Sequence, residues 1–201
     1  MQPFTTLSAV AAPLDVANID TDQILPARFL KKPRKAGYGN FLFHDERRRS
    51  EDYPLDAPAY RGAGILVADR NFGCGSSREG AVYALVDGGI RCVIAPSFGD
   101  IFASNAAKNG LLTVTLPEQT VAALRARLAA SPGAAVTVDL PAQTVTGPDG
   151  DALPFEIDPF KKRCLVEGLD DVALTLEHAE AIAAFEARVA AEEPWRVPAG
   201  T

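Results

Sequence analysis

The sequence predicts an α/β domain in which a mixed sheet is flanked by helices. Residues 64–116 alternate as strand, helix, strand, helix and strand, a succession that places parallel strands side by side through helical crossovers. Two further apolar runs, 135–140 and 152–157, flank Pro148-Asp149-Gly150, which is typical of a β-hairpin. The chain has 201 residues, 47% of them hydrophobic, and no internal repeat, so we expect a single domain over residues 1–201.

Glycines and prolines predict loops through much of the region before residue 61, and the first predicted strand comes after this region. The apolar run 65–68 predicts a buried strand that leads into turn-like residues at 71–75. A helix is expected to open at residues 76–79, where Ser76 and Glu79 have capping-box spacing, and to end at Gly88-Gly89. The loop signals of the N-terminal region are Pro26, Pro33, Gly37, Gly39, Pro54 and Pro58.

Strand and helix patterns continue to alternate after this helix. The apolar faces and the glycine and proline breaks set the bounds of each segment. The expected elements are a buried strand at 92–95, a turn and helix at 96–108 stopped by Gly110, a strand at 111–116, an amphipathic helix at 118–130, the hairpin, an alanine-rich helix at 176–191, and a tail at 192–201 that frays.

Composition excludes several classes of protein and site. Twenty basic against twenty-six acidic residues give a net charge of −6, which argues against a generally basic nucleic-acid binder. The sequence has no apolar run long enough to span a membrane, and no basic residue before Arg28 to begin a signal peptide. Three dispersed cysteines, Cys74, Cys92 and Cys164, fit a reducing cytoplasm and do not supply the clustered ligands of a zinc or iron–sulfur site. We therefore expect a cytoplasmic chain that binds no metal of its own.

Residues 73–79, here called the glycine loop, are the most informative stretch. Gly73 and Gly75 let the backbone approach a ligand, and a helix N-terminus behind them offers unpaired N–H groups to an anion. Arg78 adds a guanidinium fork suited to a carboxylate. The alternative interpretation is structural, with Ser76 as a helix cap, and the two interpretations are compatible.

A second cluster is basic. Residues 23–44 contain no acid, and five cations lie within residues 28–35, here called the basic loop. In an acidic protein such a segment predicts a site for an anionic substrate or an acidic partner, although a solvated surface loop is the alternative. Gly37 and Gly39 behind it would let residues 28–39 move as a lid. The cations are Arg28, Lys31, Lys32, Arg34 and Lys35.

The remaining polar candidates favour structural roles. Asp20-Thr21-Asp22 offers two carboxylates for a metal, but turn and cap hydrogen bonds are the commoner role of such a stretch. His44 and His178 are isolated and are expected to be surface or satisfied core residues. Cys74 lies in the glycine loop without a neighbouring base, so we do not expect a nucleophile, and Cys92 is expected in the core.

Several motifs together resemble one family. Residues 71–79, Asn-Phe-Gly-Cys-Gly-Ser-Ser-Arg-Glu, resemble the signature of the aconitase swivel domain, in the form typical of the separate small subunits of isopropylmalate dehydratases. The resemblance covers about residues 5 to 187. Its other motifs are 18–26, Asn-Ile-Asp-Thr-Asp-Gln-Ile-Leu-Pro; Pro96-Ser97-Phe98 with Asp100-Ile101-Phe102; Asn109-Gly110-Leu111-Leu112; and Gly168-Leu169-Asp170 with Leu174-Thr175-Leu176.

The resemblance implies a swivelling β/β/α domain that is active as a hydro-lyase only with a large subunit. In that family the large subunit carries a 4Fe-4S cluster, and the heterodimer isomerises 2-isopropylmalate to 3-isopropylmalate in leucine biosynthesis. The family's serine base falls on Ser76, and its substrate-carboxylate contacts fall on Ser77 and Arg78. Loop residues that read the substrate's side chain fall in the basic loop, where Lys31, Lys32 and Arg34 are the candidates. The site loops would include Asp20, Thr21, Asp22, Gly73, Cys74 and Gly75.

Two positions depart from the family pattern, and two alternatives to this function are open. Gly80 stands where the family usually has histidine, so any contact of that histidine must be absent or replaced, and Gly99 stands where alanine is common. The first alternative is a related hydro-lyase subunit acting on citramalate, homoaconitate or a methylated malate. The second is a non-catalytic anion-binding or regulatory module, against which the presence of Ser76, Ser77 and Arg78 argues.

Overall fold

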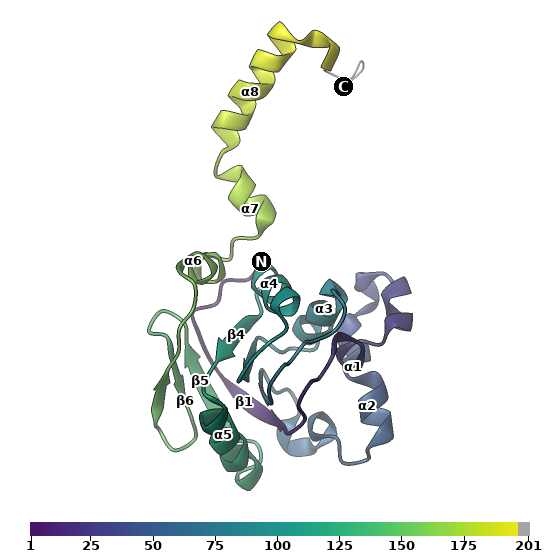
Figure 1. Cartoon of the computed structure of the whole chain (residues 1–201), viewed down its shortest axis with the longest axis vertical. Coiled ribbons are helices and arrows are strands. Elements are labelled where there is room, and N and C mark those ends of the chain that lie inside the picture. The colour runs from purple at the N-terminus through teal and green to yellow at the C-terminus, as the bar shows by residue number, and fades with distance from the viewer. Residues whose placement is uncertain (197–201) are drawn as a thin grey trace.

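A seven-stranded mixed sheet forms the centre of the computed structural model, which describes residues 1–196 (Figure 1). The strand order is β4-β3-β2-β1-β5-β6-β7, with parallel pairing from β4 to β1 and antiparallel pairing from β1 to β7. The mixed α/β sheet predicted from the sequence is confirmed. The strands are β1 (Thr6–Leu14), β2 (Ile65–Ala68), β3 (Cys92–Ala95), β4 (Leu112–Thr115), β5 (Ala135–Asp139), β6 (Thr144–Thr146) and β7 (Ala152–Pro154).

Helices cover both faces of the parallel half of the sheet. Figure 1 shows α1, α3 and α4 on one side, α5 across the other, and α7 and α8 extending away from the body. Within residues 1–196 no helix is long and apolar enough to cross a membrane. The helices are α1 (Thr21–Ile24), α2 (His44–Arg49), α3 (Glu79–Asp87), α4 (Asp100–Lys108), α5 (Glu118–Ala130), α6 (Pro159–Glu167), α7 (Asp171–Leu176) and α8 (Ala179–Glu192).

Alternating side chains of β2 divide between two hydrophobic cores. Leu66 and Ala68 pack into the core under α1 and α3, whereas Ile65 and Val67 pack into the core under α5. All four residues are fully buried because helices cover both faces. This double burial explains why the predicted strand is a continuous apolar run rather than an alternating one.

Strand β1 was not predicted, although it joins the two halves of the sheet. Its residues Ala11 to Leu14 pair in parallel with β2, and Thr6 to Val10 pair antiparallel with β5. The small alanines and Pro13 weaken the strand signal, because alanine and proline are both depleted in strands. Pairing with the neighbouring strands makes this segment a strand, and the periodicity of its own residues does not reveal that pairing.

The predicted start of the helix at residues 76–79 is wrong. Helix α3 begins at Glu79, and its N-cap Arg78 is extended and makes no side-chain cap bond. Ser76 is held before the helix instead, because the Thr21 hydroxyl donates to the Ser76 carbonyl at 2.9 Å. Glu79 accepts a hydrogen bond from the Asn109 amide at 2.8 Å rather than closing a capping box.

The C-terminal third agrees with the prediction in part. The amphipathic helix at 118–130 and a hairpin turn at Pro148-Asp149-Gly150 are confirmed. The predicted pairing of 135–140 with 152–157 is wrong, because β6, which was not predicted, lies between β5 and β7 and pairs with both; α6 was not predicted either. The alanine-rich helix expected at 176–191 is confirmed as α8, which begins at Ala179, and the short helix α7 before it was not predicted. Of the tail expected to fray, Pro194–Arg196 form a 3₁₀ turn, and residues 197–201 lie outside the described residues.

Candidate active site

Three loops meet at the edge of the sheet where the parallel strands β1, β2 and β3 end. The Gly73 N–H donates to the Ile19 carbonyl at 2.7 Å, and the Thr21 N–H donates to the Cys74 carbonyl at 3.0 Å. On the other side, the Phe72 N–H donates to the Ser97 carbonyl at 3.0 Å. Ligands of α/β proteins bind at this carboxyl edge, so the hydrogen-bonded loops form a candidate site.

Close backbone approaches explain the glycines at this edge. Gly73 has a φ of +72°, and a Cβ there would clash with the ring of Phe102 at the start of α4. A Cβ on Gly99 would lie 2.6 Å from the Gly73 carbonyl oxygen. The alanine common in the family at position 99 would therefore require the glycine loop to shift, and glycine lets the loop press against α4.

A cavity of about 300 Å³ opens beside the glycine loop. Ser76 faces solvent at its mouth, and its hydroxyl makes no hydrogen bond to any residue in the described range 1–196. Ser77, its neighbour, is also exposed. The cavity is lined by Thr21, Asn71, Gly73, Cys74, Gly75, Ser76, Arg78, Gly99, Asp100, Ile101 and Phe102.

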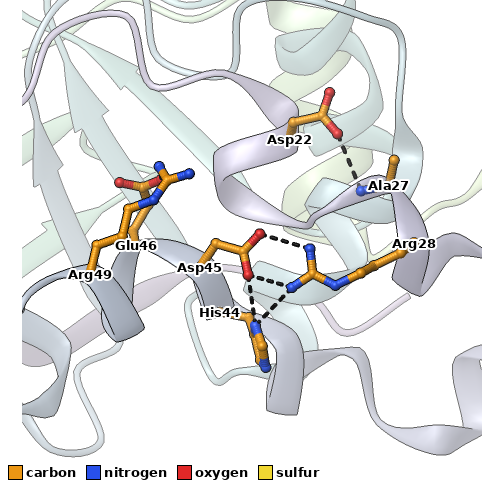
Figure 2. Close-up of polar contacts among 7 residues, drawn as sticks. All are labelled: Asp22, Ala27, Arg28, His44, Asp45, Glu46 and Arg49. Atoms are coloured by element: carbon orange, nitrogen blue, oxygen red, sulfur yellow. Dashed lines mark hydrogen bonds and ion pairs between the residues drawn. The ribbon is translucent and has the colours of Figure 1, made fainter.

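Arg78 is the cation of this cavity and is held by Asp22. Its side chain is 19% exposed, and its guanidinium forms a short ion pair with the Asp22 carboxylate. The same carboxylate oxygen accepts from the Ala27 N–H at 3.2 Å, which ties the cavity to the chain that leads into the basic loop (Figure 2). A substrate carboxylate that approaches Arg78 therefore meets a guanidinium already oriented by Asp22.

The Asp20-Thr21-Asp22 stretch forms turn and cap contacts. Asp20 caps α1 through a capping box in which its carboxylate accepts from the Gln23 N–H and the Gln23 side chain accepts from the Asp20 N–H, both at 2.8 Å. Thr21 holds the Ser76 carbonyl, and Asp22 holds Arg78. All three side chains thus have structural partners, as the turn interpretation predicts.

The cysteines do not form a metal or nucleophilic centre. The Cys74 thiol donates to the Asn18 carbonyl at 3.4 Å, and partial burial raises the pKa of the Cys74 thiol, with the Asp20 carboxylate adding to it. Cys92 is buried in β3, and burial also raises the pKa of its thiol. Among residues 1–196 no three histidine, cysteine or carboxylate side chains gather as metal ligands would. The residues present therefore do not fit an iron–sulfur cluster on this chain.

The start of the basic loop is fixed by an ion pair to α2. Arg28 donates to both oxygens of Asp45, one at 2.7 Å, and lies 3.2 Å from Nδ1 of His44 (Figure 2). The Arg28 guanidinium and the His44 ring hold the pKa of the Asp45 carboxyl below its usual range. His44 also packs edge-on against Phe29, so it is a satisfied surface residue, as predicted.

The rest of the basic loop lies along α3, away from the cavity. Arg34 stacks on the ring of Tyr83 at 3.9 Å and pairs with Asp87, in the last turn of α3, at 3.1 Å. Lys32 lies 5.6 Å above the ring of Phe41, and Lys31 forms no ion pair within residues 1–196. The structure brings Ser76 and Arg78 together at the cavity, but Lys31, Lys32 and Arg34 are not among the residues that line it.

Gly80 makes room for the basic loop on α3. A Cβ at position 80 would lie 2.6 Å from Cδ2 of Leu30 and 3.1 Å from Cδ2 of Leu25. Leu30 therefore occupies the space in which the family's usual histidine side chain would begin. An apolar contact between the basic loop and the first turn of α3 fills this position.

The sequence analysis assigned no role to several residues that the structure places at the site. Asn18 and Asn71 both adopt positive φ, 58° and 59°, and the Asn71 amide donates to Asn18 Oδ1 at 2.9 Å, which links two of the loops. Asparagine is among the non-glycine residues that best tolerate this conformation, so an asparagine three or four residues after a strand is a usable signal. Asp100 and Ile101 line the cavity because α4 starts there, which only the fold reveals.

Three family models match successive parts of the chain. Residues 1–119 match the family model described as the aconitase C-terminal domain, and this range contains the glycine loop and the cavity residues. Residues 122–159 match the LeuD_N model. Residues 171–199 match the model described as the C-terminal domain of the small subunit of 3-isopropylmalate dehydratase. Together these matches span nearly the whole chain.

Individual relatives agree with the family matches. A 3-isopropylmalate dehydratase small subunit of Paramagnetospirillum magneticum is 52% identical over 97% of this chain and 100% of its own length. The protein of the same name from Dinoroseobacter shibae is 51% identical over the same shares. Among solved structures, a 3-isopropylmalate dehydratase from Methanocaldococcus jannaschii is similar with a TM-score of 0.67 and 25% identity, over 90% of this chain and 99% of that one.

Proposed function

Because the chain belongs to the family of 3-isopropylmalate dehydratase small subunits, we propose that it supplies the proton-transferring and carboxylate-holding half of that hydro-lyase. As a member of this family, the chain is a subunit of an aconitase-type lyase of leucine biosynthesis. The observation that carries the proposal is the placement of Ser76 and Arg78 at one cavity, with the Ser76 hydroxyl not engaged as a helix cap.

The reaction needs two functions, and this chain's residues suit one of them. Isomerising 2-isopropylmalate to 3-isopropylmalate removes a proton from one carbon and hydroxide from its neighbour, then returns them at exchanged positions. Removing hydroxide calls for a Lewis acid, which in this family is an iron–sulfur cluster of the large subunit. The three cysteines are not gathered as cluster ligands, and Cys92 and Cys164 are buried, so they do not suit such a cluster and we assign it to the partner.

We propose Ser76 as the base that takes the proton from the carbon beside the substrate carboxylate. A serine hydroxyl works as a base only when its alkoxide is stabilised. The first turn of α3, three residues on, leaves backbone N–H groups without intrahelical partners and carries the positive end of the helix dipole. Arg78 adds a fixed positive charge at the same cavity.

Arg78 and Ser77 are proposed to hold a substrate carboxylate. A guanidinium presents five donors, so the pair with Asp22 leaves others for a substrate. Asp22 would then fix the plane of the guanidinium rather than block it. Such donors act most strongly as negative charge builds on the carboxylate during proton removal, and one is typically worth about 3 kcal/mol or more in the barrier.

The basic loop is proposed to recognise the rest of the substrate after a movement toward the cavity. Lys31, Lys32 and Arg34 remain our candidates, but Arg34 is fastened to Tyr83 and Asp87 along α3. Gly37, with a φ of +79°, provides a hinge behind the loop. We also propose a cytoplasmic location, since all three cysteines are free thiols.

Reconstitution with a candidate large subunit tests the function. The purified pair is assayed on 2-isopropylmalate, citramalate and homoaconitate, each with the isolated chain as the control. Turnover of 2-isopropylmalate by the pair, and by neither subunit alone, is the expected result. Preference for citramalate or homoaconitate would favour a related hydro-lyase, and tight assembly without turnover of any of the three would favour a non-catalytic module.

A further inference from the structure

The C-terminal arm, residues 171–196, carries a largely exposed apolar face on α8. No residue of α8 is buried, and Figure 1 shows α8 extending clear of the body. Ile182, Phe185 and Val189 recur at helical spacing and share one face, with Ile182 37% and Phe185 55% exposed. A helix of 14 residues is marginal when isolated in water, because helices gain most of their stability by packing an apolar face.

The arm is also strongly acidic. Within residues 171–196 six acids stand against two bases, and Glu180 and Glu186 on α8 form no ion pair with any residue in the described range. A surface that receives this arm should combine an apolar groove with basic side chains at its rim. The six acids are Asp171, Glu177, Glu180, Glu186, Glu192 and Glu193, and the two bases are Arg188 and Arg196.

The family matches indicate what the arm is for. Residues 1–119 match the C-terminal domain of aconitase, a domain that in aconitase is part of a longer chain. The arm matches a separate model described for 3-isopropylmalate dehydratase small subunits. A domain on its own chain must hold its partner without a covalent link, so a segment particular to small subunits is the natural place for an added contact.

We propose that the arm docks on the large subunit, with the Ile182–Phe185–Val189 face of α8 in a basic-rimmed apolar groove of that partner. The proposal rests on the proposed function, since it takes the large subunit as the occupant. Anchoring by the arm, outside the cavity at the glycine loop, would keep the two subunits together while the body is free to reorient over the active site. The arm would thereby raise affinity without contributing to the chemistry.

Binding of the full-length chain to the large subunit tests the proposal. The double variant Ile182→Ser with Phe185→Ser removes two apolar side chains of the face, and Ala184→Ser on the opposite side of α8 is the matched control. Calorimetry or surface binding should show the Kd raised at least tenfold by the double variant and unchanged by the control. The melting temperature of the isolated chain should stay the same for all three, because none of these residues packs on the body.

Variants of the acidic residues on α8, and the activity of the assembled pair, test the docking proposal further. Glu180→Gln with Glu186→Gln should raise the Kd severalfold at low salt and have no effect at high salt. At saturating large subunit, the apolar double variant should reach the wild-type kcat and KM, because the arm does not touch the cavity.

An unchanged Kd for the apolar double variant would overturn the docking proposal, even if the wild-type pair turns over 2-isopropylmalate. Concentration-dependent dimers of the isolated chain that the double variant abolishes would overturn it too, since the occupant would be a second copy. Conversely, arm-dependent assembly without turnover would leave docking intact and contradict the proposed function.

Discussion

The glycine loop leads into α3 and the basic loop lies along the same helix, but the two loops are held in different ways. Backbone hydrogen bonds fasten the glycine loop and the residues before it, from Gly73 to Ile19 and from Thr21 to Cys74. Side-chain contacts fasten the basic loop, from Arg28 to Asp45 and from Arg34 to Asp87 and Tyr83.

The two kinds of contact suit two different roles, holding a catalytic residue in place and recognising the substrate. Buried backbone hydrogen bonds respond little to pH or salt, which suits a base that must stay in place. Solvent-exposed ion pairs are weak and are screened by salt, which suits a segment that must move from one position to another. We therefore expect the glycine loop to keep its position and the basic loop to be able to leave its own.

Ser76→Ala should give the largest effect and would test the chemical role of the glycine loop. With the large subunit bound, turnover should fall at least about a thousandfold, equivalent to about 4 kcal/mol in the barrier. Stability should hardly change, because Ser76 is exposed and caps no helix. Melting temperature, subunit binding and kcat are measured on one preparation.

Asp20→Ala supplies the contrast for that experiment. Asp20 is a true cap, so its loss should cost about 0.5–2 kcal/mol of stability with far less effect on kcat. If Ser76→Ala stays folded and bound but retains more than about a tenth of the wild-type rate, Ser76 is not the base.

Gly73→Ala would test whether the glycine loop is as tightly fixed as its hydrogen bonds indicate. The new Cβ would meet the Phe102 ring, and alanine would be strained at a φ of +72°, so destabilisation of about 3 kcal/mol is expected. Gly62→Ala is the matched control, with a φ of +74° and open space around it, and should cost only about 1 kcal/mol. Equal melting temperatures for the two variants would show that the loop can move aside.

Arg78→Lys would separate charge from geometry at the cavity. Lysine keeps the positive charge but loses the planar fork that pairs with Asp22 and a substrate carboxylate together. We expect KM to rise and kcat to fall, with kcat/KM down roughly ten- to a hundredfold, equivalent to about 1.4–2.7 kcal/mol. Wild-type kinetics for the lysine variant would mean that the fork is not used.

The sequence predicted β2, β3 and β4 and the turns at the glycine loop, because both are encoded locally. Buried strands at 65–68 and 92–95 are continuous apolar runs, and Gly73 and Gly75 stand where the backbone needs positive φ. Strand β1 was missed because its pairing partners, not its own residues, make it a strand. The start of α3 was misplaced because Thr21, more than fifty residues away, holds the Ser76 carbonyl outside the helix.

Charge clustering at the basic loop likewise left the partners of the cations undetermined. The cations are clustered in sequence, but Arg28 and Arg34 pair with acids on α2 and α3, and neither lines the cavity. Local sequence shows that a charge is present but not which distant acid pairs with it. The roles of Lys31, Lys32 and Arg34 in substrate binding stay predictions.

Arg34→Ala would test whether the basic loop is releasable. Loss of its contacts with Tyr83 and Asp87 should speed amide hydrogen exchange across residues 29–37, and Lys35→Ala is the neighbouring control. If the loop reaches the substrate, KM should change by no more than about fivefold, equivalent to about 1 kcal/mol, with kcat nearly unchanged. Unaltered exchange in the Arg34 variant would show that the loop is held by its apolar contacts instead.

The smallest expected effect concerns Asp45, and its pH dependence identifies the group responsible. Because Arg28 and His44 hold the pKa of Asp45 below the ordinary value of about 3.9, the pair stabilises the folded loop above that pH and is lost as pH falls through the lower, folded value. Exchange at residues 29–32, corrected for its intrinsic pH dependence, should therefore be slower in wild type than in Asp45→Asn by a constant factor from pH 5 to 8. The difference should close only below about pH 4, and added salt should narrow it at every pH because the Arg28 side chain is exposed. A difference that closes anywhere above pH 5 would contradict the assignment to the Asp45 carboxylate and its pair with Arg28.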